Sequence, residues 1–439
     1  MKHLIKLTLL SVCIVGALSI LTTGCKKTNG YTHQSGAAMA VDSFTPNVGG
    51  LGTEILINGK NFSTDTTQIT VIINGNRLKV VNANGNQILA VVPAKCGSGP
   101  ITVKIGSDSI VSTGIFNYAY SRIVSTLAGN GTAGFANGSG TDAEFNFNGQ
   151  SFYRTMGIVV DSNLNIYVAD AGNHCIRKID SSGNVTTLAG NPNVSGYADG
   201  VGTAAEFVYP YDVALDAAGN VWSVDPINWD IRKIAPDGTA TTWAWGSQAP
   251  WSIAYDKVTG DIFYSSCSSP GNVYQVTAQW TAGAVISGLN YPAGIKFDKS
   301  GNLYVSMNGD QVIEQYTAGA WTGKIIAGQL GAAGYVDGAG TAAKFSDPWG
   351  IAIDAGGNLY VAGNGTWDGG TYNPDQSIRY VTAGTWNVST FAGSGTAGFV
   401  NGVGTIAAFS APTGVTVDKN GTVYVLDKNN NCIRKIISQ

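Results

Sequence analysis

The sequence predicts an all-β protein, in which a small β-sandwich is followed by a six-bladed β-propeller. The first observation is composition: 59 of the 439 residues are glycine, and together with Thr, Val, Tyr and Trp they favour many short strands joined by turns. The second is an alternation of apolar and polar residues in short runs over residues 39–120. The third is a unit that recurs six times over residues 121–439, a length that fits a repeat architecture.

The N-terminus predicts export and a lipid anchor. A basic MKHLIK and an apolar LTLLSVCIVGALSIL form the two regions of a signal segment, and LTTGC ends at Cys25. Small residues before a cysteine resemble a bacterial lipobox, which implies cleavage before Cys25 and acylation of its thiol and new amino group. We therefore expect a signal peptide over 1–24, a lipidated tether over 25–38 and an outer-membrane location, with the leaflet left open. The alternatives are an uncleaved anchor or an ordinary signal peptide.

Residues 39–120 predict the sandwich. The runs ILING, ITVIING, LKVV, ILAVVP and ITVKIG each suit a half-buried strand, and about eighty such residues make a small two-sheet domain. VDSFTPNVGGLGTEILINGKNF (41–62) and VVPAKCGSGPITVKI (91–105) resemble an IPT/TIG domain. The resemblance implies an immunoglobulin-like fold that acts as a spacer, and it brings no catalytic residue.

Residues 121–439 predict the propeller. Each unit reads as a strand, a D-x-x-G-N turn, a second strand, a loop, an I-R-K-I strand and a T-T-L-A-G strand, and four strands per unit is typical of propeller blades. The turn aspartates are Asp161, Asp216, Asp256, Asp298, Asp354 and Asp418. The units resemble NHL repeats. The last unit lacks its fourth strand, which RIVSTLAG (122–129) supplies, so the ring closes and a sheet edge disappears.

A glycine-rich loop precedes four of the six units. GFANGSGTDAEF (134–145), GYADGVGTAAEF (196–207), GYVDGAGTAAKF (334–345) and GFVNGVGTIAAF (398–409) are near-copies. Their Asp-Gly and Asn-Gly turns, their Thr-x-x-Glu capping boxes (Thr141 with Glu144, Thr203 with Glu206) and their final phenylalanines predict staples between neighbouring blades. A calcium site is the weaker alternative, because two copies carry asparagine. Strand order places all four loops on one face of the ring.

The connections into the third and fourth units lack this loop and are rich in aromatic residues, so we expect a ligand site there. Flat rings with amides and acids around a concave mouth suit sugars, whose C–H faces stack and whose hydroxyl groups need hydrogen bonds. The alternative is that several of these rings only wedge blades apart. The candidate ligand-binding residues are Trp251, Trp245, Tyr291, Trp349, Tyr211, Trp229, Arg154, Asp212 and Asp347.

The chemistry of an enzyme is weakly represented. The propeller holds one histidine, His174, no Cys/His spacing indicates a metal, and we expect no cofactor. Asp170, Asp225 and Asp427 share one repeat position, where they either cap loops or form an acidic cluster at the channel mouth. The net charge of −3 argues against nucleic acid as a partner.

The function that we expect is therefore non-catalytic: a cell-envelope lipoprotein that binds a glycan or oligosaccharide at the loop-bearing propeller face. Its domain order resembles accessory nutrient binders, which implies an outer-membrane porter as a further partner. A protein-interaction scaffold and a lyase or hydrolase with an acidic channel are the two alternatives.

Overall fold

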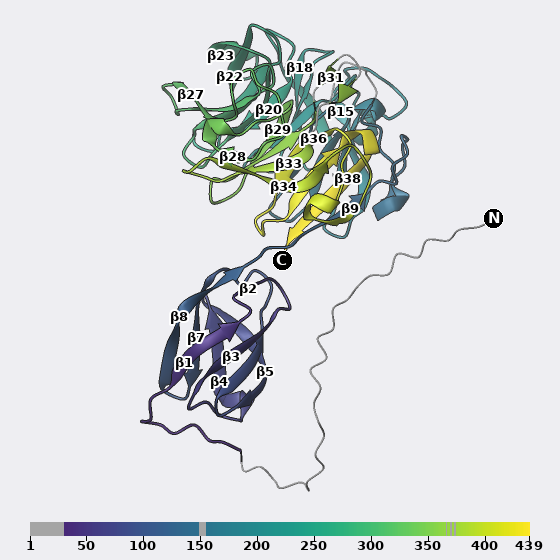
Figure 1. Cartoon of the computed structure of the whole chain (residues 1–439). Coiled ribbons are helices and arrows are strands. Elements are labelled where there is room, and N and C mark those ends of the chain that lie inside the picture. Colours follow the sequence, from purple (N-terminus) through teal and green to yellow (C-terminus); the bar gives the residue numbers. More distant parts are fainter. Residues whose placement is uncertain (1–29, 149–154, 366, 369–370, 373–374) are drawn as a thin grey trace, which may run out of the picture. The chain divides into compact units, whose positions relative to one another are not determined.

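A computed structural model describes residues 30–148, 155–365, 367–368, 371–372 and 375–439, so Cys25 and Arg154 lie outside the described residues. The chain divides into two compact units, Met1–Tyr118 and Ala119–Gln439. Nearly all of the regular structure in both is β-strand (Figure 1). Among the described residues, no helix has the length and apolar character needed to cross a bilayer.

The first unit is the expected sandwich. Its strands pair in the order β1-β3-β6-β5-β4-β7-β8-β2, and β5 belongs to both sheets because its first residues pair with β4 and its later ones with β6. The core between the sheets holds the inward-facing residues of the alternating runs, such as Ile57, Val71 and Val103. The elements are β1 (Ala40–Thr45), β2 (Val48–Gly49), β3 (Glu54–Lys60), η1 (Thr66–Gln68), β4 (Ile69–Ile73), β5 (Asn76–Asn84), β6 (Gln87–Val91), β7 (Gly99–Ile105) and β8 (Asp108–Tyr118).

The second unit is a six-bladed propeller, and its first three blades follow one another in the chain. Blade 1 contains β11 (Ile158–Val160), β12 (Ile166–Asp170), β13 (Cys175–Ile179) and β14 (Asn184–Ala189). Blade 2 contains β16 (Asp212–Leu215), β17 (Val221–Asp225), β18 (Asp230–Ile234) and β19 (Thr239–Trp245). Blade 3 contains β20 (Ser252–Tyr255), β21 (Ile262–Ser266), β22 (Gly271–Ala278) and β23 (Thr281–Leu289).

The remaining three blades complete the ring. Blade 4 contains β24 (Pro292–Phe297), β25 (Leu303–Met307), β26 (Val312–Tyr316) and β27 (Gly323–Ala327). Blade 5 contains β29 (Pro348–Ile353), β30 (Leu359–Gly363), β33 (Gln376–Val381) and β34 (Asn387–Gly395), with a small hairpin of β31 (Trp367–Asp368) and β32 (Thr371–Tyr372) after β30. Blade 6 contains β36 (Pro412–Val417), β37 (Val423–Asp427), β38 (Cys432–Ser438) and β9 (Arg122–Ala128).

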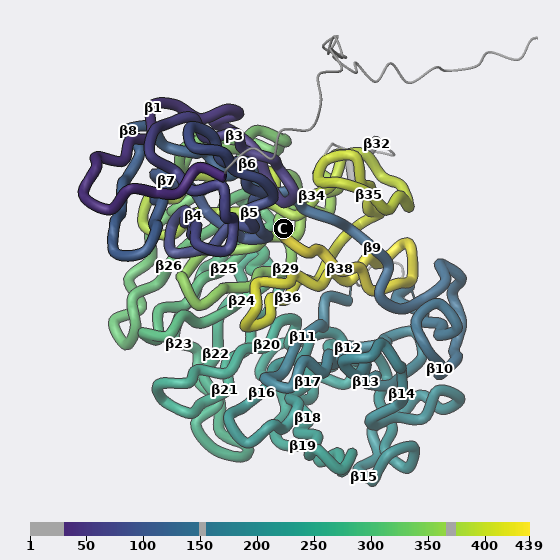
Figure 2. Tube along the Cα trace, turned by 90° about the horizontal axis from the view of Figure 1, so that it is seen from below, coloured from purple at the N-terminus to yellow at the C-terminus, as the bar shows by residue number. Residues whose placement is uncertain are grey.

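The closure predicted from the sequence is confirmed. β9 pairs antiparallel with β38, with Val124 opposite Ile436, and Ser121 N donates to Gln439 O at 2.8 Å. The innermost strands contact one another in the cyclic order β11, β16, β20, β24, β29, β36 and back to β11. Figure 2 shows these six strands around the centre of the ring. A narrow channel therefore runs along the propeller axis.

The four glycine-rich loops each add a fifth strand to the outer edge of the blade that follows. β10 (Gly138–Ser139) pairs with β14, β15 (Gly200–Val201) with β19, β28 (Gly338–Ala339) with β34, and β35 (Gly402–Val403) with β9. Each short strand leads into one 3-10 turn: η2 (Gly140–Asp142), η4 (Gly202–Ala204), η5 (Gly340–Ala342) and η6 (Gly404–Ile406). The terminal phenylalanines are fully buried between neighbouring blades, as expected.

Two expectations about these loops are wrong. The capping boxes do not form, because Thr141 and Thr203 lie inside the 3-10 turns and no side chain caps either turn. The loops also do not build up one face. Gly140 N donates to Gly183 O at 3.0 Å, and Gly183 lies in the turn between the third and fourth strands, on the opposite face. The loops therefore run across the outer edges of their blades and cover backbone groups that would otherwise be unpaired.

A buried arginine in the third strand anchors each loop. Arg177 donates from Nη1 to Glu144 O at 3.0 Å, and from Nη2 to Ala136 O at 2.7 Å and Asn137 Oδ1 at 2.8 Å. Its guanidinium lies 5.1 Å from the ring centre of Phe145. Arg232, Arg379 and Arg434 make the same contacts in blades 2, 5 and 6.

Blades 3 and 4 lack both the loop and the arginine. Tyr274 and Glu314 stand at the arginine position, and within the described residues no short strand covers the outer strands β23 and β27. The loop and its anchor therefore form one structural unit that is present or absent together. Their joint occurrence in the sequence was a signal for this pairing that sequence reasoning missed.

Candidate functional site

Three of the predicted aromatic side chains are exposed on the face that carries the second-to-third loops. Trp229 is 49%, Trp245 is 48% and Tyr291 is 44% exposed. Trp229 lies in the loop between β17 and β18, and Trp245 ends β19. Gly246 N donates to Trp229 O at 2.7 Å, so the two indoles belong to adjacent backbone segments of blade 2. Their exposure agrees with the sequence-based prediction for this surface.

A continuous polar segment connects Trp245 to Tyr291 across blade 3. Gln248 Oε1 accepts from Ser266 Oγ at 2.6 Å and from Asn272 Nδ2 at 3.3 Å, which fixes the bare connection to the second-to-third loop of that blade. Tyr291 N donates a hydrogen bond to Ser268 O of the same loop at 2.9 Å. The half-buried amides of this segment offer hydrogen-bond partners beside the exposed rings. We call Trp229, Trp245, Gln248, Asn272 and Tyr291 the aromatic face.

The predicted exposure of three other aromatic residues is wrong. Tyr211, Trp251 and Trp349 are 0%, 7% and 6% exposed. The ring centres of Tyr211 and Trp251 are 5.1 Å apart, and those of Trp251 and Trp349 are 6.4 Å apart. They come from blades 2, 3 and 5 and share one apolar cluster with Met156 of blade 1. Rings from such separate blades meet only across the axis, so this cluster fills the end of the channel.

The reason for the burial is the geometry of the first strand. Each of these rings stands at the start of the innermost strand of its blade. In five of the six blades, the residue at this position directly follows a proline. Close backbone approach around the ring leaves little room at the next position, since a Cβ on Gly294 would lie 2.5 Å from Trp349 O. The large rings therefore turn toward the axis, where they bury apolar surface, and not toward solvent.

The two predicted acids also have structural roles. Asp212 accepts from Ser252 Oγ at 2.7 Å and from Ile253 N at 3.0 Å, and so joins blade 2 to blade 3. Asp347 has a positive φ of 59° and accepts from Asn364 Nδ2 at 3.0 Å. Both carboxyl groups are buried, so the prediction that they face a ligand at the mouth is wrong. Arg154 lies outside the described residues.

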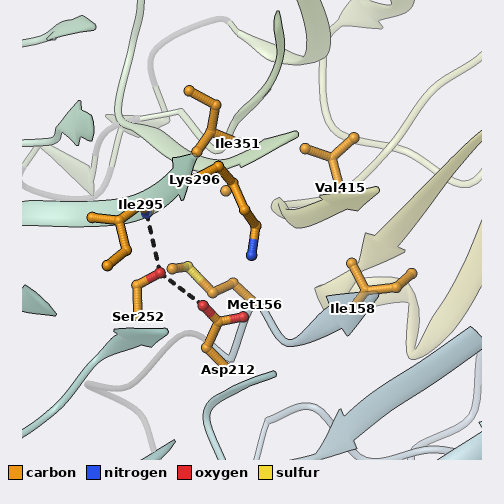
Figure 3. A pocket seen from close by; sticks show the side chains of 10 residues that line it. Met156, Ile158, Asp212, Ser252, Ile295, Lys296, Ile351 and Val415 are labelled. Carbon is orange, nitrogen blue, oxygen red and sulfur yellow. Dashed lines mark hydrogen bonds between the residues drawn. The ribbon is translucent and has the colours of Figure 1, made fainter. Parts of the chain in front are cut away.

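The contact of Asp212 belongs to a belt of hydrogen bonds around the channel. Gly157 N donates to Tyr211 O at 3.0 Å, Ile295 N to Ser252 Oγ at 3.1 Å, and Thr413 Oγ1 to Thr155 O at 2.6 Å. Ser306 Oγ donates to Trp349 O. Figure 3 shows the Asp212, Ser252 and Ile295 part of this belt. Each contact joins neighbouring blades, which holds the inner strands together where the sheets are closest.

The aspartates that share one repeat position cap loops, which agrees with the first of the two interpretations. Asp170 accepts from Asn146 N at 2.8 Å and from Arg177 Nη1 at 2.7 Å. Asp225 and Asp427 likewise accept from backbone amides of their own blades. Burial raises the pKa of all three carboxyl groups, to about 6 for Asp427. Each carboxyl group is therefore committed to its own blade.

Blade 5 reaches the same arrangement by a different route. Gly363 stands at the position of these aspartates, and a Cβ there would lie 2.5 Å from the carboxyl carbon of Asp375. Asp375 precedes the third strand and forms an ion pair with Arg379 at 3.2 Å. The buried carboxyl group is therefore supplied by the neighbouring strand, into the space that the glycine leaves.

A further carboxyl group, which sequence reasoning missed, lies beside the aromatic face. Asp230 follows Trp229, is fully buried and pairs across the sheet with Trp245. Among the described residues neither of its oxygens has a hydrogen-bond partner, and Arg232 Nη1 is 3.9 Å away. Burial, reinforced by the charge of Asp225, raises its pKa to about 8. The sequence does contain a signal for this residue: the same repeat position holds a cysteine in blades 1 and 6, Cys175 and Cys432, where blade 2 has a carboxyl group.

Metal and thiol chemistry find no support in the described part of the chain. It contains no group of three or more His, Cys, Asp or Glu side chains arranged to hold a metal ion. His174 Nδ1 contacts Val208 O at 2.6 Å, so the imidazole is engaged by a neighbouring loop. Cys96, Cys175 and Cys432 are buried free thiols.

Comparison with known families agrees with both units. Residues 39–120 match the IPT/TIG domain, and residues 156–179 and 409–436 match the NHL repeat. The chain thus carries an IPT/TIG domain followed by an NHL-repeat propeller.

Two curated relatives match much of the chain. The chain is 29% identical over 321 residues to protein SUPPRESSOR OF QUENCHING 1 of Arabidopsis thaliana, which covers 71% of this chain and 27% of that protein. It is 29% identical over 309 residues to NHL repeat-containing protein 2 of Homo sapiens, which covers 66% of this chain and 39% of that protein. The chain therefore spans less than half the length of these relatives.

Several solved structures share the whole two-unit fold. A Bacteroides thetaiotaomicron protein of unknown function has a TM-score of 0.62 at 18% identity and covers 93% of this chain and 100% of that one. Auxiliary nutrient binding proteins from Bacteroides ovatus and Bacteroides thetaiotaomicron have TM-scores of 0.56 and 0.57 at 22% identity. They too cover 93% of this chain, and 100% and 99% of their own. At these identities the likeness shows the fold.

Proposed function

We propose that this protein is a non-catalytic binding protein of the cell envelope, which takes a glycan or oligosaccharide on the aromatic face. The observation that carries the proposal is the exposure of Trp229 and Trp245, which stand on adjacent backbone segments of blade 2. A ligand that binds an exposed indole displaces the water over its ring easily. The flat face of the indole also matches the C–H face of a pyranose ring. Large contact area at low entropic cost is typical of binding surfaces that use tryptophan and tyrosine.

The polar residues of the aromatic face supply the second part of sugar recognition. Gln248 and Asn272 are held by each other and by Ser266, so their amide groups are preorganised. Among the described residues none accepts a hydrogen bond from Gln248 Nε2, which is therefore available to a hydroxyl group. Tyr291 lies at the far end of the same segment. Rings flanked by fixed amides favour a sugar chain over a purely apolar ligand.

The structural neighbours support the binding role at a coarser level. Two proteins with the same two-unit fold are auxiliary nutrient binding proteins. By analogy with them, the tether and the IPT/TIG domain would present the propeller to nutrients near an uptake porter in the outer membrane. Lipidation at Cys25 is the anchor that this arrangement needs, and it is part of the proposal.

A glycan array probed with the purified protein tests the proposal. We expect binding to at least one family of oligosaccharides or polysaccharides, and competition by the soluble form of the same sugar. The absence of binding to every glycan would contradict it. Capture of an envelope protein in that case would favour the alternative, a protein-interaction scaffold.

A further inference from the structure

The propeller channel contains a cavity at the end opposite to the aromatic cluster of Tyr211, Trp251 and Trp349. Its volume is about 180 Å³. Every blade contributes the second-to-last residue of its innermost strand to the lining: Val159, Ala214, Ala254, Lys296, Ala352 and Thr416. The next residues of these strands, among them Leu215, Tyr255 and Phe297, add further apolar side chains to the lining. The cavity lies where the first-to-second turns surround the channel.

Lys296 is the exception in this ring of small residues. It stands where three other blades carry alanine, and it lines both this cavity and a narrow part of the channel beyond it. Figure 3 shows Lys296 in the narrow part. Its ammonium group carries three donors. Within the described residues it makes one hydrogen bond, to Ile253 O at 3.4 Å, and no ion pair. The ammonium group therefore stands at the inner end of the cavity, with N–H donors left for a ligand.

The channel does not continue as an open pore. The narrow part beyond Lys296 has a volume of about 10 Å³, which is room for about one water molecule. Past it, the channel is filled by the buried rings of Tyr211, Trp251 and Trp349. The cavity is thus a blind pocket, with mostly apolar side chains in its wall and a positive charge at its closed end.

The charges around the pocket limit the ligand. Lys257 and Lys296 are the charged residues in the described lining. Asp212 lines the narrow part beyond Lys296, with its carboxylate engaged by Ser252 and Ile253. The turn aspartates of the blades lie near the open end, and Asp298 is held by its own turn. Two cations line the pocket, and the carboxylates near its open end repel each negative charge that a ligand carries, which favours a ligand with a single negative charge over a phosphate dianion.

We propose that this pocket binds a small monocarboxylate with an apolar body, with the carboxylate against Lys296 Nζ and the body against the ring of alanines. An apolar cavity of about 150 Å³ in another protein accommodates benzene, so a pocket of about 180 Å³ has room for one aromatic ring or a short branched chain. The site is separate from the aromatic face, and each proposal can fail without the other.

Benzoate and its neutral counterpart benzyl alcohol test the site. Calorimetry on the purified protein compares wild type with Lys296→Met, which keeps the length of the side chain, and with Lys299→Met in the exposed turn of the same blade. We expect benzoate affinity to fall by about tenfold or more in Lys296→Met and to stay unchanged in Lys299→Met. Benzyl alcohol should bind both variants and wild type alike.

Methyl NMR on the wild-type protein gives a readout that does not depend on the folding of a variant. Benzoate should shift the methyl signals of Ala214, Ala254 and Ala352, and glycan titration should leave them in place. Equal benzoate affinity in wild type and Lys296→Met, or unchanged alanine signals at saturating benzoate, would overturn the proposal.

Discussion

Arg379 forms an ion pair with Asp337 at 2.7 Å, although the two residues lie 42 positions apart in the chain. Arg379 is fully buried in the third strand of blade 5, and Asp337 belongs to the loop that covers the outer edge of that blade. Asp337 Oδ2 also accepts from Thr390 N at 3.0 Å in the outer strand. The arginine thus holds the middle of the blade, its edge and its covering loop in one network.

Removal of this anchor should destabilise the propeller. Arg379→Met removes the guanidinium hydrogen bonds to the carbonyl oxygens of Lys344 and Val336 and leaves Asp375 buried without its cation. We expect the free energy of unfolding of the propeller to fall by about 3–5 kcal/mol, measured by denaturant titration. Lys324→Met, on the exposed outer strand of blade 4, is the control. A loss no larger than that of the control would show that the loop holds without its arginine.

Asp230→Asn should change the pH dependence of stability. The folded-state pKa of about 8 lies above the ordinary value of 3.8, so between these values the folded state binds more protons than the unfolded state. The free energy of unfolding contributed by this group therefore falls as pH rises from about 4 to about 8. Asparagine removes the buried charge that forms at high pH. The melting temperature of the variant minus that of wild type should therefore be larger at pH 8 than at pH 5.

The charges that face Asp230 are those of Asp225, Arg232 and Asp199, and the variant leaves all three in place. Thermal melts at the two pH values give the comparison, with Asp142→Asn on an exposed loop as the control. The same difference from wild type at pH 5 and pH 8 would contradict a raised pKa for Asp230.

The two tryptophans of the bare connection should respond oppositely to truncation. Trp251→Ala removes a buried ring that contacts Tyr211 and Trp349, and should cost about 3–5 kcal/mol in the free energy of unfolding. Trp245→Ala removes an exposed ring, and its stability should stay within about 0.5 kcal/mol of wild type. Denaturant unfolding of both variants measures this. Equal losses in the two variants would contradict the assignment of Trp251 to the core and of Trp245 to the surface.

Cys25→Ser tests the proposed anchor. Expressed in a Gram-negative bacterium, wild-type protein should partition with the membrane fraction and incorporate radiolabelled fatty acid, because several acyl chains give a firm hold. The variant should lose the label and leave the membrane fraction. A variant that stays in the membrane without label would point to the uncleaved-anchor alternative.

The sequence predicts the fold well because the strands, turns and closing strand are local patterns. The missing fourth strand of the last unit and RIVSTLAG at the start of the propeller need only strand counting to be matched. The orientation of Trp251 and Trp349 could not be predicted in this way. It depends on how closely six inner strands approach the axis, which is a property of the whole ring.

The acids of the candidate site show a similar limit. Asp212 replaces a glycine found in other blades, and this exchange is visible in the sequence, but its partner Ser252 lies 40 residues away. Asp375 supplies from the start of the third strand the buried carboxyl group that other blades supply from the end of the second strand. An alignment of repeat positions therefore does not find it. The exposure of Trp229, Trp245 and Tyr291 was predicted because loop ends beside bare connections have little that covers them.

The most direct test of sugar binding at the aromatic face is calorimetric titration of a glycan panel into wild type, Trp245→Ala and Trp280→Ala. Trp280 is equally exposed but lies in the turn between the third and fourth strands of blade 3, away from the aromatic face. We expect a glycan that binds wild type and Trp280→Ala with equal affinity and Trp245→Ala about tenfold more weakly, or about 1.4 kcal/mol. Equal affinities for all three proteins, or no binding by wild type, would contradict the account.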